Sequence, residues 1–198
     1  RIQSPSHTEM FVLRSYPGRL HGALNLMSSK VYVVTGMPGA GKEEFAQTAV
    51  SLGYSLIRMG DVVRKEAANQ GIIMDDRGVG GFASDERQKR GADIWARRCL
   101  PYIEHNSVID GCRSLDEMSL FREKFGKDSI LIAIEAPADL RFKRLQQRGR
   151  SDAPQTIEEF KERDLREIGW GLADLIKCAD DTIVNDGSLE SFHEKVKK

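Results

Sequence analysis

The chain has 198 residues, enough for one domain with its own hydrophobic core, and its 30 basic and 30 acidic side chains cancel. This neutral balance gives no overall attraction to nucleic acid or to an anionic membrane, so any basic surface has to be local. Three widely separated cysteines, Cys99, Cys112 and Cys178, match neither a metal site nor a disulfide framework. They favour a reducing cytoplasm. No apolar run approaches the roughly 20 residues of a membrane span, so we expect a soluble globular protein.

Residues 1–26 differ from the rest of the chain. They carry prolines and glycines, one acidic residue (Glu9) and no sustained periodicity. Met27-Ser-Ser-Lys30, followed at once by an apolar run, suits the start of a domain. We therefore expect a tail at 1–26, either added, encoded upstream or a loose, disordered extension, and one domain at 27–198. A targeting peptide is the alternative for the tail because it contains arginines.

The domain starts with a phosphate-loop pattern. A β-branched run at 31–35 predicts a buried strand, and the run at 43–52 predicts a helix. Between them lies Gly36-Met-Pro-Gly-Ala-Gly41-Lys42, and strand, glycine-rich turn and helix in this order indicate a phosphate-binding loop. Glycines let backbone N–H groups face phosphate, and the helix N-terminus adds its dipole. Lys42 can reach the β- and γ-phosphates of a nucleoside triphosphate.

The position after this lysine departs from the pattern. A Ser or Thr hydroxyl that holds Mg²⁺ is typical there, whereas this chain has Glu43. Its carboxylate could bind the metal directly or repel the phosphates, and both alternatives stay open.

The next segment predicts a strand at 54–59 and a helix that ends near Gly71. Asp61 is expected as the helix N-cap, which places Arg64 near the helix N-terminus, where it could hold a second anion. An ordinary solvated arginine is the alternative. The glycine-rich stretch 75–81 predicts a loop, and 84–100 predicts one amphipathic helix.

A third short strand, expected at 107–110, ends in Asp110. In parallel sheets ligands bind at the carboxyl ends of strands, and an Asp in this place orients Mg²⁺ and its water. Arg113 is expected to point into the same crevice. The alternative is that Asp110 caps the helix that begins near Ser114.

A further strand at 129–136 precedes a basic helix. Arg141, Arg144 and Arg148 recur at helical spacing on one face, and Arg148-Gly-Arg150 continues into a turn before a helix capped by Thr156. Arginines on such a turn suit a lid that closes over phosphates. An RNA-facing surface is the alternative.

Two features end the chain. Gly169-Trp170-Gly171 indicates close packing or a hinge, without a mechanistic role. The run 180–185 predicts a fifth strand, followed by a turn and a short helix.

These segments resemble adenylate kinases and related nucleoside monophosphate kinases over residues 30–198. The phosphate loop carries the resemblance, with Gly60-Asp61-Val-Val-Arg64, Asp110-Gly-Cys-Arg113, Arg148-Gly-Arg-Ser-Asp152 and Val184-Asn-Asp-Gly-Ser188 in the expected order. It is closest to archaeal adenylate-kinase-related proteins, and the last segment also resembles dephospho-coenzyme A kinases. The resemblance implies that Arg64 holds the acceptor's phosphate and that Asn185 lies near the adenine. It also implies that a missing hydroxyl at position 43 does not abolish activity.

The alternation of five strands with helices predicts a three-layer α/β fold with a parallel sheet. The resemblance adds the sheet order 2-3-1-4-5, helices that bind the acceptor and a short lid. We expect the catalytic residues to be Lys42, Asp110, Arg113, Arg148 and Arg150, with Asp110 as the metal ligand. We expect the residues that bind ATP and the acceptor to be Gly36, Met37, Pro38, Gly39, Ala40, Gly41, Lys42, Glu43, Asp61, Arg64 and Asn185.

The expected function is Mg²⁺-dependent phosphoryl transfer from ATP to a nucleotide-like acceptor, with AMP, another nucleoside monophosphate and dephospho-coenzyme A all open. A nucleotide-binding sensor or regulatory NTPase is the second hypothesis, motivated by Glu43 and by the short spacing from Asp110 to Arg113. An RNA-associated NTPase is the third. Neither nucleic acid nor a membrane is an expected partner, and a monomer or small homo-oligomer is expected.

Overall fold

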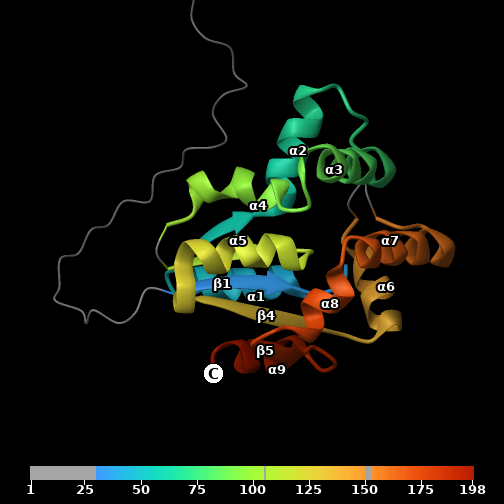
Figure 1. Ribbon diagram of the computed structural model, residues 1–198. Helices are drawn as coiled ribbons and strands as arrows, with labels where there is room; N and C mark the ends of the chain where they lie inside the picture. The colour runs from blue at the N-terminus through green and yellow to red at the C-terminus, as the bar shows by residue number, and fades with distance from the viewer. Residues whose placement is uncertain (1–29, 105, 150–152) are drawn as a thin grey trace, which may run out of the picture.

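The computed structural model describes residues 30–104, 106–149 and 153–198 (Figure 1). The expected tail at 1–26 and Arg150 lie outside these ranges. Within them, no helix combines the length and the apolarity needed to cross a membrane.

Five described strands form one parallel sheet in the order β2-β3-β1-β4-β5, as predicted (Figure 1). They are β1 Val31–Thr35, β2 Ser55–Arg58, β3 Ser107–Asp110, β4 Ser129–Glu135 and β5 Asp181–Val184. Val31 of β1 pairs with Ser107 on one side and Ser129 on the other, so these strands start level. Their carboxyl ends therefore lie along one edge of the sheet, where the phosphate loop begins.

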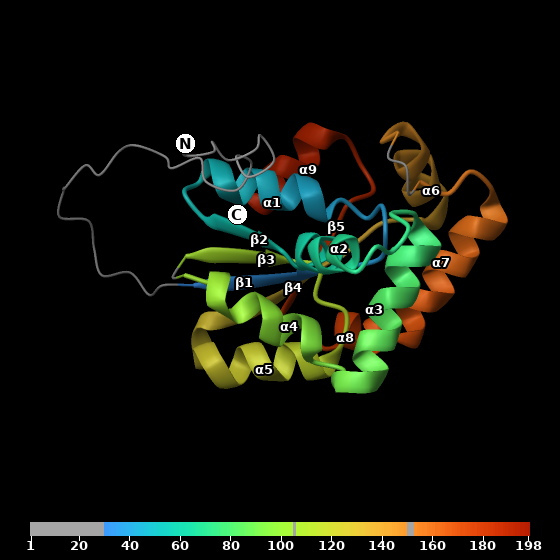
Figure 2. The ribbon, with the colours of Figure 1, turned by 90° about the horizontal axis from the view of Figure 1, so that it is seen from above.

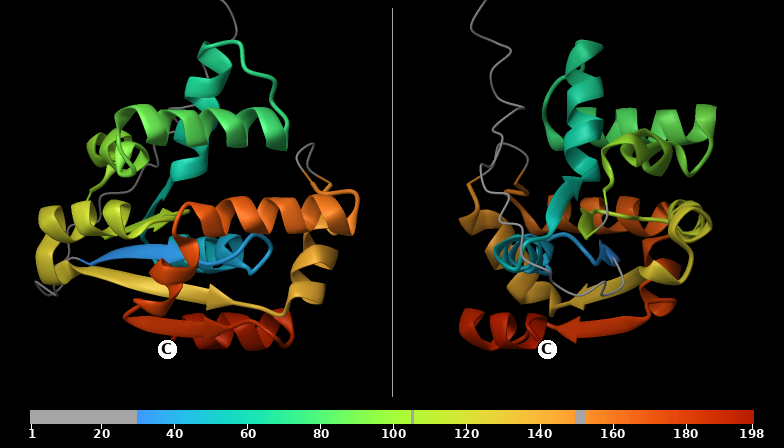
Figure 3. Two further views of the ribbon diagram at one scale, coloured as in Figure 1. Left: turned by 45° about the vertical axis from the view of Figure 1, so that its right-hand side comes forward. Right: turned by 90° about the vertical axis from the view of Figure 1, so that its left-hand side faces the viewer.

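Helices cover both faces of the sheet, which confirms the predicted three layers. Figure 2 shows α1 and α9 on one face and α4, α5 and α8 on the other. The described helices are α1 Lys42–Ser51, α2 Met59–Asn69, α3 Asp76–Arg90, α4 Ile94–Cys99, α5 Leu115–Phe125, α6 Ala138–Gln147, α7 Ile157–Gly169, α8 Leu172–Lys177 and α9 Leu189–Val196, with 3₁₀ turns η1 Leu100–Tyr102 and η2 Gly126–Asp128. Figure 3 shows α2 and α3 projecting from this body, with α7 beside α3.

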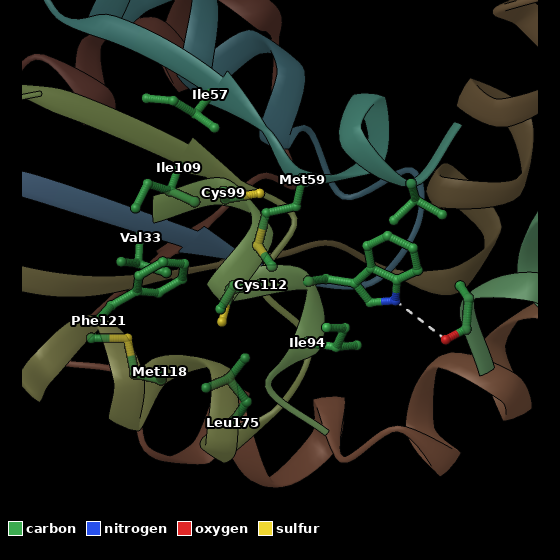
Figure 4. Packing of buried hydrophobic residues seen from close by; sticks show 14 of the residues in the cluster. Val33, Ile57, Met59, Ile94, Cys99, Ile109, Cys112, Met118, Phe121 and Leu175 are labelled. Carbon is green, nitrogen blue, oxygen red and sulfur yellow. Dashed lines mark hydrogen bonds between the residues drawn. The ribbon is translucent and has the colours of Figure 1, made fainter. Parts of the chain in front are cut away.

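The larger core lies between the sheet and α4, α5 and α8. Figure 4 shows Val33 and Ile109 of the sheet packed with Phe121 of α5. Cys99 and Cys112 are buried in this core, and Cys178 is exposed at the end of α8. Burial raises the pKa of the Cys99 thiol to about 12, so this thiol stays protonated at neutral pH.

Two sequence predictions for the segment 59–100 are wrong. The stretch 75–81, expected as a loop, forms the start of α3, which the Asp75 carboxylate caps by accepting from Gly78 N at 2.6 Å. Glycine costs about 1 kcal/mol in a helix, but tertiary contacts with α7 offset this local preference. The helix expected over 84–100 is divided at Gly91, whose φ of +106° ends α3.

A third correction concerns Asp61, which was expected as the N-cap of α2. The helix already starts at Met59 and Arg58 occupies the cap position, so Asp61 lies in the first turn. Asp61 is exposed and pairs with Arg64 one turn later. The prediction failed because β2 runs directly into α2 without a turn between them.

Candidate functional site: a phosphate loop beside an arginine-lined cavity

The loop between β1 and α1 owes its shape to glycines. Gly36, Gly39 and Gly41 have φ of +141°, +81° and +114°, conformations that side chains disfavour. A Cβ at Gly36 would also collide with the carbonyl oxygen of Ile134 in β4. The loop closes with a hydrogen bond of 3.1 Å from Ala40 N to Met37 O. Its inner side lines a cleft of about 110 Å³.

Side chains from α6 and from the end of β5 support the outer side of this loop. Arg141 donates to Pro38 O at 3.1 Å and pairs with Asp164 at 2.6 Å. Asn185 donates to Ala40 O at 2.8 Å, and Arg144 in turn donates to the Asn185 backbone and side-chain oxygens. Arg141 and Arg144 are therefore supports of the loop and do not form the basic outward face that a lid or an RNA surface would need.

Lys42 lies over its own loop. Its Nζ donates to Gly36 O at 2.5 Å and to Met37 O at 3.1 Å. Burial lowers the pKa of this amine to about 8, although the Asp110 carboxylate opposes the shift. The ammonium is thus within the cleft and poised to exchange two carbonyl oxygens for phosphate oxygens.

Glu43, the unusual residue after the lysine, is bound by an arginine. Arg58 at the end of β2 donates to Glu43 through Nη2 at 2.5 Å and Nε at 3.2 Å, and Gln47 donates to the same carboxylate at 2.8 Å. Burial alone would raise the pKa of Glu43, but these hydrogen bonds outweigh it and leave the pKa below its ordinary value. The carboxylate is ionised and neutralised by Arg58, so it adds no net repulsion toward phosphates.

Asp110 ends β3 level with Val34 of β1 and Arg58 of β2. Ser114, whose side chain accepts from Glu117 N at 3.2 Å, caps α5, so Asp110 is not the cap of that helix. Burial raises the pKa of Asp110, and Lys42 opposes the shift. Its Oδ1 is buried and has no hydrogen-bond partner in the described part of the chain. A divalent cation would supply that partner, and one carboxylate beside phosphates suits Mg²⁺.

Arg113 connects the cleft to a second cavity. Its Nε donates to Glu167 of α7 at 2.5 Å, and its Nη1 donates to Gly111 O at 2.7 Å. Burial opposes the charge on this guanidinium, but Glu167 outweighs it and raises the pKa of Arg113. The Arg113 backbone N–H donates to Glu117 at 2.6 Å. Arg113 is therefore a fixed positive charge at the carboxyl edge of the sheet.

The second cavity, which we term the acceptor cavity, has a volume of about 310 Å³ and lies between α2, α3 and α7. Its apolar wall includes Val63, Val79 and Ala83. Its charged lining consists of Arg64, Arg87, Arg113, Arg163, Arg166, Asp75, Asp76 and Glu167, with Trp170 beside them. Gly60, Arg64, Arg113, Arg163 and Glu167 line both the cleft and this cavity, so the two spaces are adjacent.

Most predicted site residues come together in the cleft. Its lining includes Gly36, Pro38, Gly39, Gly41, Lys42, Glu43, Arg64, Asp110, Arg113 and Arg148. Met37 packs against the core, Ala40 is buried, and Asn185 is buried behind the loop and bound to its backbone. Arg150 cannot be placed because it lies outside the described residues.

Several side chains of the site were not predicted from the sequence. Arg58 stands at the carboxyl end of a strand, the same signal that selected Asp110, and could have been found by it. Arg87, Asp76 and Glu167 carry no local signal, because their partners are distant in sequence. For Trp170 the sequence indicated close packing or a hinge, without a mechanistic role.

Comparisons with known proteins agree with this geometry. A family model described as an AAA domain matches residues 35–161. UPF0200 proteins of Thermoplasma volcanium and Thermoplasma acidophilum are 47% and 46% identical over 168 residues, which cover 84% of this chain and 93% and 92% of theirs. The chain belongs to the AAA-domain family and to the UPF0200 family. A UPF0200/UPF0201 protein of Archaeoglobus fulgidus is 44% identical over 87% of this chain, which spans only 55% of that relative.

Solved structures place this UPF0200 chain among P-loop kinase folds. TT1252 from Thermus thermophilus is similar with a TM-score of 0.57 and 19% identity, covering 85% of this chain and 95% of its own. Shikimate kinase from Bacteroides thetaiotaomicron has a TM-score of 0.54 and 18% identity, covering 86% and 97%. At such identities the similarity establishes the fold alone. The similarity confirms that the chain resembles P-loop kinases in its fold.

Proposed function

We propose that the protein transfers the γ-phosphoryl group of ATP to a small, nucleotide-like acceptor that carries a phosphate, with AMP as the first candidate. The observation that carries this proposal is the shared wall of the cleft and the acceptor cavity, which contains Arg64, Arg113 and Arg163. A donor in the cleft and an acceptor in the cavity would meet at these guanidiniums. Positioning and charge neutralisation supply most of the rate in phosphoryl transfer. Guanidiniums that hold both substrates at this wall are therefore sufficient to catalyse the reaction.

In this mechanism the loop backbone and Lys42 bind the β- and γ-phosphates. Arg148 lines the cleft from the end of α6 and neutralises charge on the transferred group; Arg150 is expected to assist it. Asp110 would hold Mg²⁺, which when bound neutralises phosphate charge and orients the nucleotide. Arg58 neutralises the Glu43 carboxylate beside the loop.

On the acceptor side, Arg64 and Arg113 bind the acceptor's phosphate. Glu167 fixes the Arg113 guanidinium, so its orientation is set before the acceptor arrives. Helices α3 and α7 form two walls of the cavity, and a bound acceptor would displace water from between them.

The test is ADP release from ATP and Mg²⁺, with and without AMP, CMP, UMP, GMP or dephospho-coenzyme A. We expect one acceptor to stimulate turnover and Lys42→Ala to abolish it. Lys89→Ala, which removes an exposed lysine of α3 outside both spaces, is the matched control and retains turnover. Unchanged turnover in Lys42→Ala would contradict the mechanism.

A nucleotide sensor is the second candidate, and one observation favours it: Glu43 replaces the metal-binding hydroxyl and is bound to Arg58. Tight ATP binding by calorimetry without stimulation by any acceptor would support this function. Restored turnover in Glu43→Ser would then assign the loss to this residue.

A further inference from the structure

Trp170 lies on the wall of the acceptor cavity, beside three of its arginines. Its indole Nε1 donates to Ser84 Oγ of α3 at 3.0 Å, which fixes the orientation of the ring. Gly171, with φ of +98°, follows Trp170 and is the N-cap of α8. The tryptophan therefore sits at the junction of α7 and α8 and is tied to α3.

Three guanidiniums from three different segments surround this ring. The Cζ atoms of Arg87, Arg113 and Arg166 lie 4.6, 5.6 and 5.8 Å from a ring centroid of Trp170. These arginines belong to α3, to the loop after β3 and to α7. An aromatic face attracts a cation within about 6 Å, and more strongly where water is excluded.

Each of the three guanidiniums also has a carboxylate partner. Arg87 pairs with Glu117 at 2.8 Å, Arg113 with Glu167 at 2.5 Å, and Arg166 with Asp76 at 2.7 Å. Every guanidinium is thus held by one carboxylate and by the shared ring. The electron-rich face of the ring offsets part of the repulsion among the three like charges, and without it each guanidinium would lose this shared contact.

The charge of the cavity indicates what these arginines bind. Its lining contains five arginines and three carboxylates, and Asp61 and Glu117 pair with Arg64 and Arg87 from outside the lining. Five carboxylates thus face five guanidiniums. A phosphate monoester carries close to two negative charges at neutral pH and competes with these carboxylates for the guanidinium N–H groups that line the cavity.

Trp95 provides an internal comparison. It also has a guanidinium over its ring, Arg98 at 4.7 Å, but it is fully buried in the core and does not line the acceptor cavity. Trp170 is half-buried and lies on the cavity wall. This difference indicates a packing role for Trp95 and a role at the acceptor site for Trp170.

We infer that Trp170 is the positioning residue of the acceptor site, holding Arg87, Arg113 and Arg166 in the arrangement that binds the phosphate monoester of the acceptor. This inference rests on the proposed function, whose acceptor it describes. It also explains the Gly169-Trp170-Gly171 segment, because the ring is presented between two helices, where three cations reach it.

The first test is steady-state kinetics of two variants. Trp170→Leu removes the ring and is expected to raise the acceptor KM by roughly tenfold or more, which corresponds to the loss of one to two desolvated cation–π contacts. The ATP KM should stay within about twofold, because ATP binds in the cleft. Trp170→Phe keeps an aromatic face and should restore the acceptor KM to within about threefold of the wild type.

Arg98→Gln is the matched control for loss of a cation–π pair elsewhere, because it removes the cation over the Trp95 ring. It is expected to lower the melting temperature without changing the acceptor KM. Unchanged acceptor KM in Trp170→Leu would overturn the inference, as would an equal rise of both KM values. A Phe variant as weak as the Leu variant would also overturn it, because the hydrogen bond to Ser84 would then be the essential contact.

A second test does not need turnover. With the cleft filled by a non-hydrolysable ATP analogue and Mg²⁺, inorganic phosphate is titrated while tryptophan fluorescence is followed, against chloride at equal ionic strength. We expect a saturable change that Trp170→Phe abolishes, and calorimetry should show roughly tenfold weaker phosphate binding in Trp170→Leu. An absent fluorescence change or equal phosphate affinity would overturn the inference. If no acceptor gives turnover but both results hold, the proposed function fails and the anion site remains.

Discussion

The cleft and the acceptor cavity share a wall but differ in what they are made of. The loop side of the cleft consists of backbone, with glycines at Gly36, Gly39 and Gly41. The cavity consists of side chains contributed by α2, α3 and α7, and its arginines are ion-paired in the described structure. The first space recognises phosphate by shape and N–H groups, and the second recognises its ligand through a set of placed charges.

This difference predicts how the two spaces respond to mutation. A site made of backbone loses phosphate binding when a substitution makes its backbone conformation unfavourable, because no single side chain determines its affinity. A site made of side chains changes its ligand affinity gradually, since each ion pair can be altered separately. Variants of either space therefore test this difference.

The largest effect is expected for Arg113, which belongs to both spaces. Arg113→Ala should lower kcat/KM for the acceptor by roughly 10³-fold, because it removes a buried guanidinium that binds the acceptor's phosphate. It also leaves the buried Glu167 without its partner, so stability should fall. Steady-state kinetics and urea unfolding measure both effects. The double variant Arg113→Ala/Glu167→Gln should regain stability without regaining activity, and activity within tenfold of the wild type in either variant would refute the role.

The next effect concerns the backbone of the loop. Gly36→Ala forces a side chain into φ of +141° and against Ile134 O, and we expect a loss of about 3 kcal/mol in the free energy of unfolding. Gly53→Ala is the control, because Gly53 also has a positive φ, +95°, but nothing lies near its Cβ position. It should cost about 1 kcal/mol. If urea unfolding shows the same loss of unfolding free energy in both variants, the contact with β4 is unimportant.

A smaller effect is expected for Asp76, which binds Arg166 through both carboxylate oxygens, at 2.8 and 2.7 Å, and lies 3.4 Å from Arg163. Asp76→Asn removes this competing negative charge from the cavity. We expect the acceptor KM to fall roughly fivefold, the upper range for a partly exposed ion pair. Asp85→Asn, on the exposed side of the same helix, is the control. A rise in KM would instead mean that Asp76 orients the arginines for the acceptor.

The smallest effect is a pH dependence of ATP binding. The protonated form of Lys42 binds phosphate, and its pKa of about 8 means that this form is lost as the pH rises through 8. The Kd of ATP with Mg²⁺ should therefore rise roughly fourfold between pH 7 and pH 8.5. Calorimetry across this range measures it. Lys42→Arg should show a flat profile because arginine stays charged; a slope of equal size in that variant would place the titration elsewhere.

The two spaces also differ in how far the sequence predicts them. The strand, the loop and Asp110 follow from local patterns, because a phosphate loop needs contiguous glycines and a strand end is visible in the sequence. The sheet order came from the resemblance to kinases. The acceptor cavity was predicted only through Arg64 and Arg113.

The remainder could not be predicted, because its determinants lie far apart in the chain. Arg113 pairs with Glu167, which is 54 residues away in the sequence, and Arg166 pairs with Asp76, which is 90 residues away. The glycines of 75–81 suggested a loop, yet Gly80 lies in a helix where a Cβ would approach the Arg166 guanidinium within 2.8 Å. The reason for a glycine there becomes visible only when α3 and α7 are seen together.

The burial of two of the three thiols has a consequence for experiments on motion. Cys99 and Cys112 are enclosed in the core, and burial raises the pKa of both, so alkylating reagents meet an unreactive thiol at each. Cys178 is exposed immediately after α8. A maleimide dye or spin label would therefore attach at this one site in the unmodified chain. Paired with a second label on α3, it would report whether the helix bearing Asp76 moves when nucleotide and acceptor bind.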